Sequence, residues 1–256
     1  MKSHTLKEKL ANGEATLGSW ICSYDLASAE TMVEIGFDWQ LIDLEHSPFD
    51  LERLEAILMT FKNTDVVPIA RVAWNDINST KRVMDLGAEA ILVPMVNSRK
   101  DAEQAVSLCK YPPLGTRGVA PRRAAAQGEF DEYVRQANER MLVMVQIEHI
   151  DAVQEAEAIM TTPGLDGVII GKIDLMASMG LLPQWGHPDL EAVVEDLIAT
   201  AKRVNCPIGM AVANEQDAAS WAGKGVQMMW ITSDLGYMYS AAAASLERFR
   251  KLVNQA

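Results

Sequence analysis

The feature that most constrains the fold of this 256-residue chain is a repeated alternation between short apolar runs and longer amphipathic segments. Most of the apolar runs are continuous, which is typical of strands that are buried on both faces of a parallel sheet. The runs span residues 17–21, 39–44, 66–72, 90–96, 142–147, 168–171, 208–212 and 228–231. The segment 116–120 is interpreted either as a further strand or as a loop.

Amphipathic patterns of helical spacing lie between these runs. They span residues 26–35, 51–61, 77–86, 101–109, 129–140, 151–160, 190–204, 215–222 and 235–253. Asp25 and Asp50 stand directly before two of them, where an N-cap side chain is favoured. This alternation predicts one α/β domain over residues 1–256, a (β/α)₈ TIM barrel. An open doubly wound sheet is the alternative, but no GxGxxG follows the first strand and no GxxxxGK[ST] occurs, which disfavours nucleotide binding.

Charge and composition exclude several classes of partner. The chain carries 23 Lys+Arg against 35 Asp+Glu, a formal charge of −12, which disfavours nucleic acid and anionic membrane. No apolar stretch approaches the ~20 residues of a membrane span, and the N-terminus lacks the apolar run of a secretory signal. The cysteines, Cys22, Cys109 and Cys206, form no CxxC pair. We therefore expect neither a disulfide framework nor a thiolate zinc site, and a cytoplasmic location.

Polar residues follow the apolar runs at the points where the strands are expected to end. They are Asp43, Glu45 and His46, then Arg71, then Gln146 and Glu148, then Gly171 and Asp174, and finally Asn214. In a barrel these strand ends converge on one mouth. Glu148 and Asp174, without paired thiolates, suit Mg²⁺ or Mn²⁺, which keep positions open for water and substrate. Alternatively, both carboxylates are solvated helix caps.

Three other features at the expected mouth each have two interpretations. His46, beside carboxylates, is a candidate general base or else a surface loop histidine. Arg71 is placed to stabilise an oxyanion or hold a carboxylate, or else to pair with a neighbouring helix. Residues 171–174 (Gly-Lys-Ile-Asp) lie between a strand and a short helix. Their free N–H groups make either a carboxylate site or a simple tight turn.

Several motifs along the chain together carry a resemblance to a known family. They are LGSW (17–20), GFDW (36–39), LIDLEH (41–46), ARVAWND (70–76), LVPMV (92–96), YPPLGTRGV (111–119), VQIE (145–148) and ANE (213–215). With these motifs the sequence resembles the HpcH/HpaI family of class II pyruvate aldolases, of the 4-hydroxy-2-oxoheptanedioate and 2-keto-3-deoxy-sugar-acid aldolase type. The resemblance runs almost end to end.

The resemblance implies a metal-dependent barrel of the phosphoenolpyruvate/pyruvate-binding type. It implies reversible cleavage of 4-hydroxy-2-oxo acids to pyruvate and an aldehyde, in aromatic or sugar-acid catabolism. It also implies a hexamer, a trimer of dimers that exchange their C-terminal helices. The implied metal ligands are Glu148 and Asp174, which would hold Mg²⁺, Mn²⁺ or Co²⁺.

The resemblance also assigns roles to other residues. The implied groups that position the keto acid are Gln146, Gly171, Lys172 and Ile173. Arg71 would steady the enolate, and His46, oriented by Asp85, would serve acid–base chemistry. Trp20 and Val212 would line the aldehyde end of the site. The sequence departs from the family at Lys172, where a proline is common.

Two other functions remain open at this stage. The first is an acyl-CoA lyase of the citramalyl-CoA type, for which the basic residues of a CoA groove would be Arg117, Arg122 and Arg123. The second is a non-catalytic protein that binds keto acids. An assay of both substrate classes separates the two enzymes. Tight pyruvate binding without proton exchange would identify the binding protein.

Overall fold

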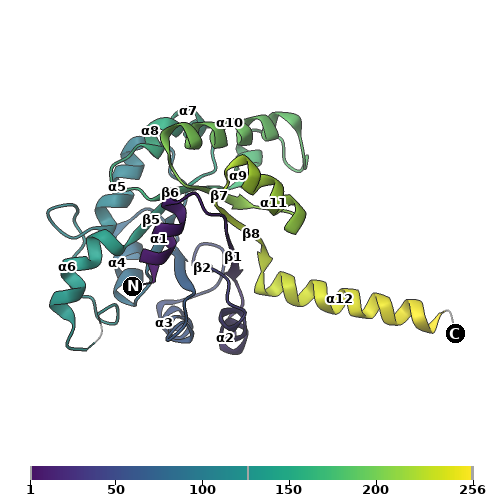
Figure 1. The fold of residues 1–256 in the computed structure, drawn as a ribbon, viewed down its shortest axis with the longest axis horizontal. Helices are drawn as coiled ribbons and strands as arrows, with labels where there is room; N and C mark the ends of the chain where they lie inside the picture. Colours follow the sequence, from purple (N-terminus) through teal and green to yellow (C-terminus); the bar gives the residue numbers. More distant parts are fainter. Residues whose placement is uncertain (1, 126, 255–256) are drawn as a thin grey trace.

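Eight parallel strands close into a barrel in which each strand pairs with the next in sequence and β8 pairs with β1. The computed structural model describes residues 2–125 and 127–254 (Figure 1). The strands are β1 (Thr16–Ile21), β2 (Trp39–Asp43), β3 (Val67–Arg71), β4 (Ala90–Val93), β5 (Leu142–Ile147), β6 (Gly167–Ile170), β7 (Ile208–Ala211) and β8 (Met228–Ser233). The predicted barrel is confirmed, and residues 116–120 form a loop.

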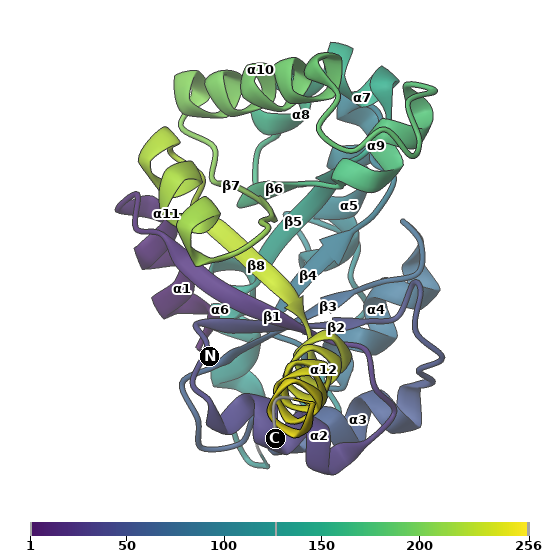
Figure 2. The ribbon, with the colours of Figure 1, turned by 90° about the vertical axis from the view of Figure 1, so that its right-hand side faces the viewer.

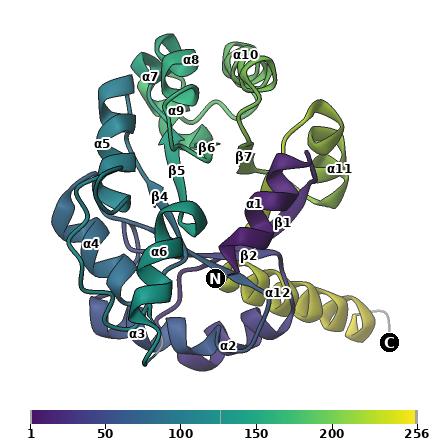
Figure 3. The same ribbon diagram turned by 60° about the vertical axis from the view of Figure 1, so that its left-hand side comes forward.

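Helices surround the strands, as Figure 3 shows. They are α1 (Ser3–Ala11), α2 (Leu26–Glu34), α3 (Leu51–Thr60), α4 (Ile77–Asp85), α5 (Arg99–Cys109), α6 (Phe130–Arg140), α7 (Ile150–Gln154), α8 (Ala156–Met160), α9 (Lys172–Ser178), α10 (Pro188–Val204), α11 (Glu215–Lys224) and α12 (Asp234–Val253). The two predicted caps are confirmed, because the Asp25 and Asp50 carboxylates accept backbone N–H groups of the first turns of α2 and α3. The single helix expected over 151–160 is wrong, since the chain breaks there into α7 and α8.

Helix α1, which the sequence pattern does not predict, closes the N-terminal end of the barrel. Leu6 and Leu10 are buried and pack in one cluster with Trp39, which begins β2. Lys7 and Lys9 form ion pairs with Asp166 and Asp38, at 2.9 Å and 2.5 Å. Leu6 and Leu10 are four residues apart, so both fall on the same helix face. Two leucines are too weak a periodic signal to predict a helix from sequence.

The alternation of side chains along each strand positions the functional site. In β3, Ile69 belongs to the inner cluster of the barrel whereas Ala70 packs in the outer one, between strands and helices. Because strand side chains alternate with a period of two, Arg71 at the end of β3 points inward. The same register makes Asp43 inward-facing after Leu41 in β2. Polar side chains at the strand ends therefore stand on a packed apolar floor.

Helix α12 leaves the barrel after β8 and projects away from it (Figures 1 and 2). Its first residue, Asp234, is buried and accepts the backbone N–H groups of Cys22 and Ser23, at 3.0 and 3.1 Å. Beyond this anchor, Met238, Tyr239 and other large apolar side chains are exposed. Across residues 2–125 and 127–254, no helix combines the length and the apolar character that a membrane crossing needs.

Candidate active site

A buried ion pair between Asp43 and Arg71 forms one side of the barrel mouth. The Nε and Nη2 atoms of Arg71 lie 2.9 Å and 2.8 Å from the two carboxylate oxygens of Asp43. These side chains are only 5% and 4% exposed. Asp43 Oδ1 also accepts the backbone N–H of Glu45 at 3.1 Å. A bidentate pair of this kind fixes a guanidinium in its own plane, so Arg71 is held in one orientation.

Glu45 extends this cluster toward the centre of the mouth. Its Oε2 atom lies 3.2 Å from Arg71 Nη1 and 3.7 Å from His46 Nε2. Burial raises the pKa of Glu45, whereas the positive charge of Arg71 acts in the opposite direction. Arg71 therefore contacts two carboxylates, those of Asp43 and Glu45. Of these, Glu45 holds a proton more readily than an exposed glutamate does, because its pKa is raised.

Tryptophan rings form the floor beneath Arg71. The guanidinium carbon lies 4.3 Å from the centre of the Trp20 ring, and Trp20 stacks on Trp230 at 5.2 Å. A cation over an indole face gains about 0.5–2 kcal/mol, depending on its desolvation. The buried Trp20 Nε1–H has no hydrogen-bond partner among the described residues. This N–H is therefore free to donate to a bound molecule.

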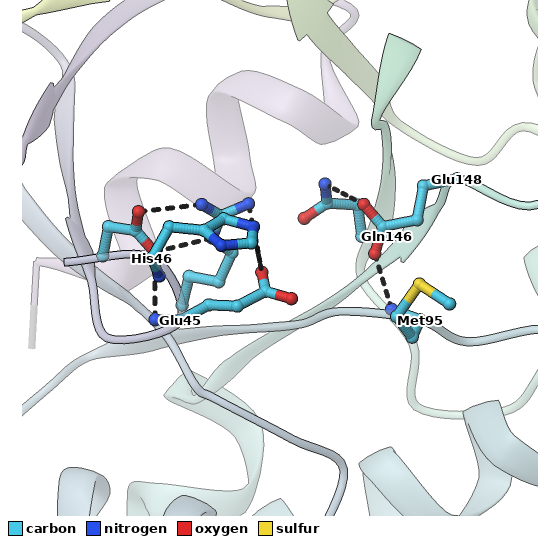
Figure 4. Close-up of polar contacts among 7 residues, drawn as sticks. Glu45, His46, Met95, Gln146 and Glu148 are labelled. Atoms are coloured by element: carbon cyan, nitrogen blue, oxygen red, sulfur yellow. Dashed lines mark hydrogen bonds and ion pairs between the residues drawn. The ribbon is translucent and has the colours of Figure 1, made fainter. Parts of the chain in front are cut away.

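Gln146, one residue before the end of β5, and Glu148, just after it, form the opposite side of the mouth (Figure 4). The backbone N–H of Met95 donates to Glu148 Oε1 at 2.7 Å, and Gln146 Nε2 donates to Oε2 at 2.5 Å. Met95 adopts a left-handed conformation with φ +53°, which is rare outside glycine. Strained backbone of this kind is concentrated at functional sites, and here it accompanies an N–H aimed at Glu148.

Glu148 is almost fully buried, with 3% of its surface exposed. Burial raises its pKa to about 7, and the carboxylates of Glu45 and Asp174 act in the same direction. The hydrogen bond from Met95 and the charge of Arg71 act against this shift. Charged groups on both sides of the mouth therefore influence the pKa of Glu148.

The loop that carries Asp174 packs directly on these two side chains. A Cβ atom at Gly171 would lie 2.6 Å from Glu148 Oε2 and 2.7 Å from Gln146 Nε2, so only glycine fits there. Asp174 follows in the first turn of α9 and is exposed. The close approach at Gly171 brings an exposed carboxylate and a buried one to the same edge of the mouth.

The oxygen atoms at this edge fit a hard divalent cation. Gln146 Oε1 is buried and has no hydrogen-bond partner in the described part of the chain. Glu148 and Asp174 add carboxylates, and oxygen-only donors suit Mg²⁺ or Mn²⁺. Within the described residues, no group of three or more His, Cys, Asp or Glu side chains is arranged to hold a metal. Two carboxylates would leave most coordination positions to water and substrate.

Comparison with known proteins identifies the family to which this barrel belongs. The model of the HpcH/HpaI aldolase/citrate lyase family matches residues 16–241. The chain belongs to the HpcH/HpaI family. The resemblance predicted from the sequence is thereby confirmed, and so is the expected enzyme class, a carbon–carbon lyase of the aldolase type.

Relatives and a crystal structure match most of the chain. The hydroxypyruvate/pyruvate aldolase of Roseobacter denitrificans is 39% identical over 204 residues, 79% of this chain and 78% of that protein. The 2-dehydro-3,6-dideoxy-6-sulfogluconate aldolase of Pseudomonas putida is 37% identical over 234 residues, 91% and 92% of the two chains. An HpcH/HpaI aldolase/citrate lyase family protein from Burkholderia cenocepacia has a TM-score of 0.91 at 29% identity, covering 96% and 99%.

The expected contact between His46 and Asp85 does not form within this chain. The His46 side chain is 63% exposed, and Asp85 lies 3.1 Å from Nη2 of Arg117. Asp85 ends α4, and in an HpcH/HpaI barrel, as in any (β/α)₈ barrel, helices end at the face opposite the mouth. A residue at the mouth and a residue at the end of a helix therefore cannot bond in one subunit.

The other predicted site residues take different positions around the mouth. Lys172 Nζ lies 3.1 Å from Glu191 Oε1 on α10, so its charge is directed away from Glu148. Ile173 is exposed, whereas Val212, after β7, is buried. The Lys172 ammonium is thus part of an ion pair that ties α9 to α10.

Asp43 and Glu45 were predicted at the mouth without a role, and Met95 was not predicted there; all three contribute to the site. Asp43 has a sequence signal, because it continues the inward period of Trp39 and Leu41 to the end of β2. Glu45 lies two residues further on, beyond the strand, where periodicity no longer applies. Met95 acts through its backbone N–H, for which the residue type carries no signal.

Proposed function

We propose that this protein is a divalent-metal-dependent aldolase that reversibly cleaves a 4-hydroxy-2-oxo acid to pyruvate and an aldehyde. One observation carries the proposal: a buried carboxylate and an orphaned amide oxygen, on Glu148 and Gln146, face a fixed guanidinium, Arg71, across one mouth. The Glu148 carboxylate fits a cation, and the Arg71 guanidinium fits a developing oxyanion. Relatives named as pyruvate aldolases support the same reaction class.

Glu148 and Asp174 would hold the ion, which is Mg²⁺, Mn²⁺ or Co²⁺. When bound, such an ion acts as a Lewis acid on the keto acid and stabilises negative charge that develops on its oxygen. Gln146, whose amide oxygen has no hydrogen-bond partner among the described residues, positions the keto acid. The Gly171 N–H donates to the Ile147 carbonyl at 3.0 Å, so in this proposal the backbone N–H groups of Lys172 and Ile173 face the keto-acid carboxylate.

Arg71 supplies a second positive partner for the enolate oxygen. Asp43 holds the guanidinium through two contacts, so no reorganisation is needed as charge develops. His46, beside Glu45, removes the proton of the C4 hydroxyl, through water because its side chain stands at the solvent edge. Trp20 and Val212 line the end of the site that takes the aldehyde.

Proton exchange in pyruvate tests this function directly. Incubation with pyruvate and Mg²⁺, Mn²⁺ or Co²⁺ in deuterated water is expected to exchange the methyl protons, because the enolate forms reversibly. EDTA should abolish the exchange and added metal should restore it, as followed by proton NMR. Borohydride with pyruvate should trap no adduct, since Lys172 is paired with Glu191. Full exchange after exhaustive chelation, or an adduct at Lys172, would contradict the proposal.

The structure removes one of the three arginines that would form a CoA groove in an acyl-CoA lyase. Arg117 is completely buried and contacts Asp85 and Tyr133, so it is not available to a CoA groove. Assay of citramalyl-CoA in parallel with 4-hydroxy-2-oxo acids is expected to give turnover with the keto acids only.

The ion pair between Lys172 and Glu191 yields a further prediction. It ties the first residue of α9, two positions before Asp174, to α10. Glu191→Gln should loosen this loop and weaken Mn²⁺ binding by about 3–10-fold, as measured by calorimetry; outer groups around metal ligands typically contribute 10–100-fold. The matched control is Glu195→Gln, on the same helix as Glu191, which breaks the exposed pair between Glu195 and Lys224 of α11. Equal affinities in the two variants would contradict this role.

We propose that α12 is exchanged between subunits and that the protein assembles as a hexamer, a trimer of dimers. Its exposed apolar side chains include Met238, Phe249 and Leu252. Exposed apolar surface on this scale marks an interface, and the helix extends away from its own barrel (Figure 1).

We also place the enzyme in the cytoplasm, because the three cysteines remain free thiols.

A further inference from the structure

We propose that Trp230 is a positioning residue for Arg71, and that it acts through Trp20. The inference rests on the proposed function, in which Arg71 meets the developing enolate oxygen. Trp230 lies on β8, Trp20 on β1 and Arg71 on β3, so the three side chains come from different strands around the mouth. The stack of the Trp230 and Trp20 indoles sets the height and tilt of the Arg71 guanidinium.

The contacts form a continuous column from the barrel core to the site. Trp39 meets Trp230 edge-on, with ring centres 6.2 Å apart and an interplanar angle of 73°. Trp230 stacks on Trp20 at 5.2 Å with an angle of 28°. The guanidinium carbon of Arg71 lies 4.3 Å from the centre of Trp20. Each ring therefore supports the next group toward the mouth.

The foot of the column is fixed independently of the rings above it. Trp39 is fully buried, and its Nε1–H donates to Thr16 Oγ1 at 3.1 Å. A Cβ atom at Gly18 would overlap the Trp39 ring, so the glycine makes room for it. Loss of the Trp230 side chain would therefore leave Trp39 and its surroundings in place, and would remove the ring on which Trp20 stacks.

Arg71 needs support in two directions. Its nitrogen atoms are fixed in the guanidinium plane by Asp43 and Glu45. Contacts in the plane do not prevent the guanidinium from tilting out of it. The Trp20 ring, which lies beneath the guanidinium, restrains that tilt.

Trp20 in turn has no polar anchor of its own. Its Nε1–H is buried without a hydrogen-bond partner in the described part of the chain. The orientation of the Trp20 ring is set by packing alone, and Trp230 supplies the stacked face. Trp230 thus controls the position of a residue that it does not touch.

The test is a double-mutant cycle between Trp230 and Arg71. Trp230→Leu is expected to lower kcat for retro-aldol cleavage about tenfold with KM for the keto acid changed less than about threefold, since small displacements of a charged group impair the transition state most. Trp230→Phe retains a stacking ring and should keep kcat within about threefold. In an Arg71→Lys background, Trp230→Leu should produce no further loss, because the group that it positions is gone.

Readouts other than turnover separate positioning from general damage. Mn²⁺ affinity, measured by calorimetry, should not change in Trp230→Leu, whereas the affinity for oxalate, a planar enolate mimic, should fall about tenfold. The matched control is Trp185→Leu, which removes an exposed indole and should change neither. If Trp230→Leu does not fold, Trp230→Met carries the same expectations with a smaller change in volume.

Two results would overturn the inference. One is an unchanged kcat in folded Trp230→Leu or Trp230→Met. The other is the same tenfold loss in the Arg71→Lys background as in the wild type, which would assign Trp230 to general stability. Failure of the underlying function is distinguishable, because the wild-type protein itself would then show no metal-dependent proton exchange in pyruvate.

Discussion

Glu148→Gln is expected to abolish metal binding and yet to stabilise the metal-free protein above pH 7. The carboxylate of Glu148 is buried, and burial raises its pKa to about 7 from an ordinary value of 4.5. Removing this ligand should weaken Mn²⁺ binding at least about 100-fold and lower kcat by about 10³ or more. The substitution preserves shape and removes only the charge that the ion would balance.

The sign of the stability effect follows from the raised pKa. The folded state favours neutral Glu148, so its contribution to stability is full below about pH 4.5 and is lost as the pH rises through 7. The amide of Glu148→Gln stays neutral at every pH. The metal-free variant should therefore melt at a higher temperature than the metal-free wild type at pH 8, and at the same temperature near pH 4.5. For a chain of this size, 1 kcal/mol corresponds to about 2–4 °C.

The hydrogen bonds at this position tolerate the change. The new amide oxygen accepts the Met95 N–H, and the Gln146 amide turns so that its unpaired Oε1 accepts from the new amide nitrogen. Asp174→Asn is the matched control, since Asp174 is exposed: it should lose metal affinity without gaining stability. Scanning calorimetry at pH 4.5 and 8, with EDTA, measures both. A less stable Glu148→Gln at pH 8, or retained Mn²⁺ affinity, would refute this account.

The strands could be predicted because each is a continuous apolar run that ends in a polar residue. Arg71 follows Val67 and Ile69 in the inward register, and Gln146 follows Met144 in the same way. The sequence thus contained both sides of the mouth. The predicted barrel also brought these residues to one mouth, but the orientations and contacts of their side chains depend on three-dimensional packing that the residue pattern does not specify.

Other parts of the site depend on geometry that residue types do not encode. The left-handed backbone at Met95 aims an N–H at Glu148, and a methionine gives no sign of this. Asp85 was matched to His46 through the family resemblance, whereas helix direction places it beside Arg117. Trp230 was predicted only as part of an apolar run. Its contribution becomes apparent from the packing of β8 against β1.

Arg71→Lys is expected to lower kcat by about 10²–10³ while Mn²⁺ affinity stays within a few-fold of the wild type. A lysine keeps the positive charge near Glu45 and Glu148, so the electrostatic environment of the metal ligands is largely retained. It cannot reproduce the two parallel contacts with Asp43, at 2.9 and 2.8 Å, or the flat face over Trp20. Steady-state kinetics of retro-aldol cleavage, with calorimetry for the metal, measure the two effects separately.

The buried pair requires a control for stability, because an unpaired Asp43 would destabilise the fold. Breaking a buried ion pair on one side costs about 3–5 kcal/mol, whereas replacing both partners by neutral groups costs far less. Arg71→Ala should therefore lower Tm, and Arg71→Met with Asp43→Asn should recover most of that loss. Neither variant should regain activity, because the guanidinium that meets the enolate oxygen is missing in both. Recovery of kcat in the double variant would show that Arg71 serves folding alone, and a kcat unchanged in Arg71→Lys would remove the guanidinium from the mechanism.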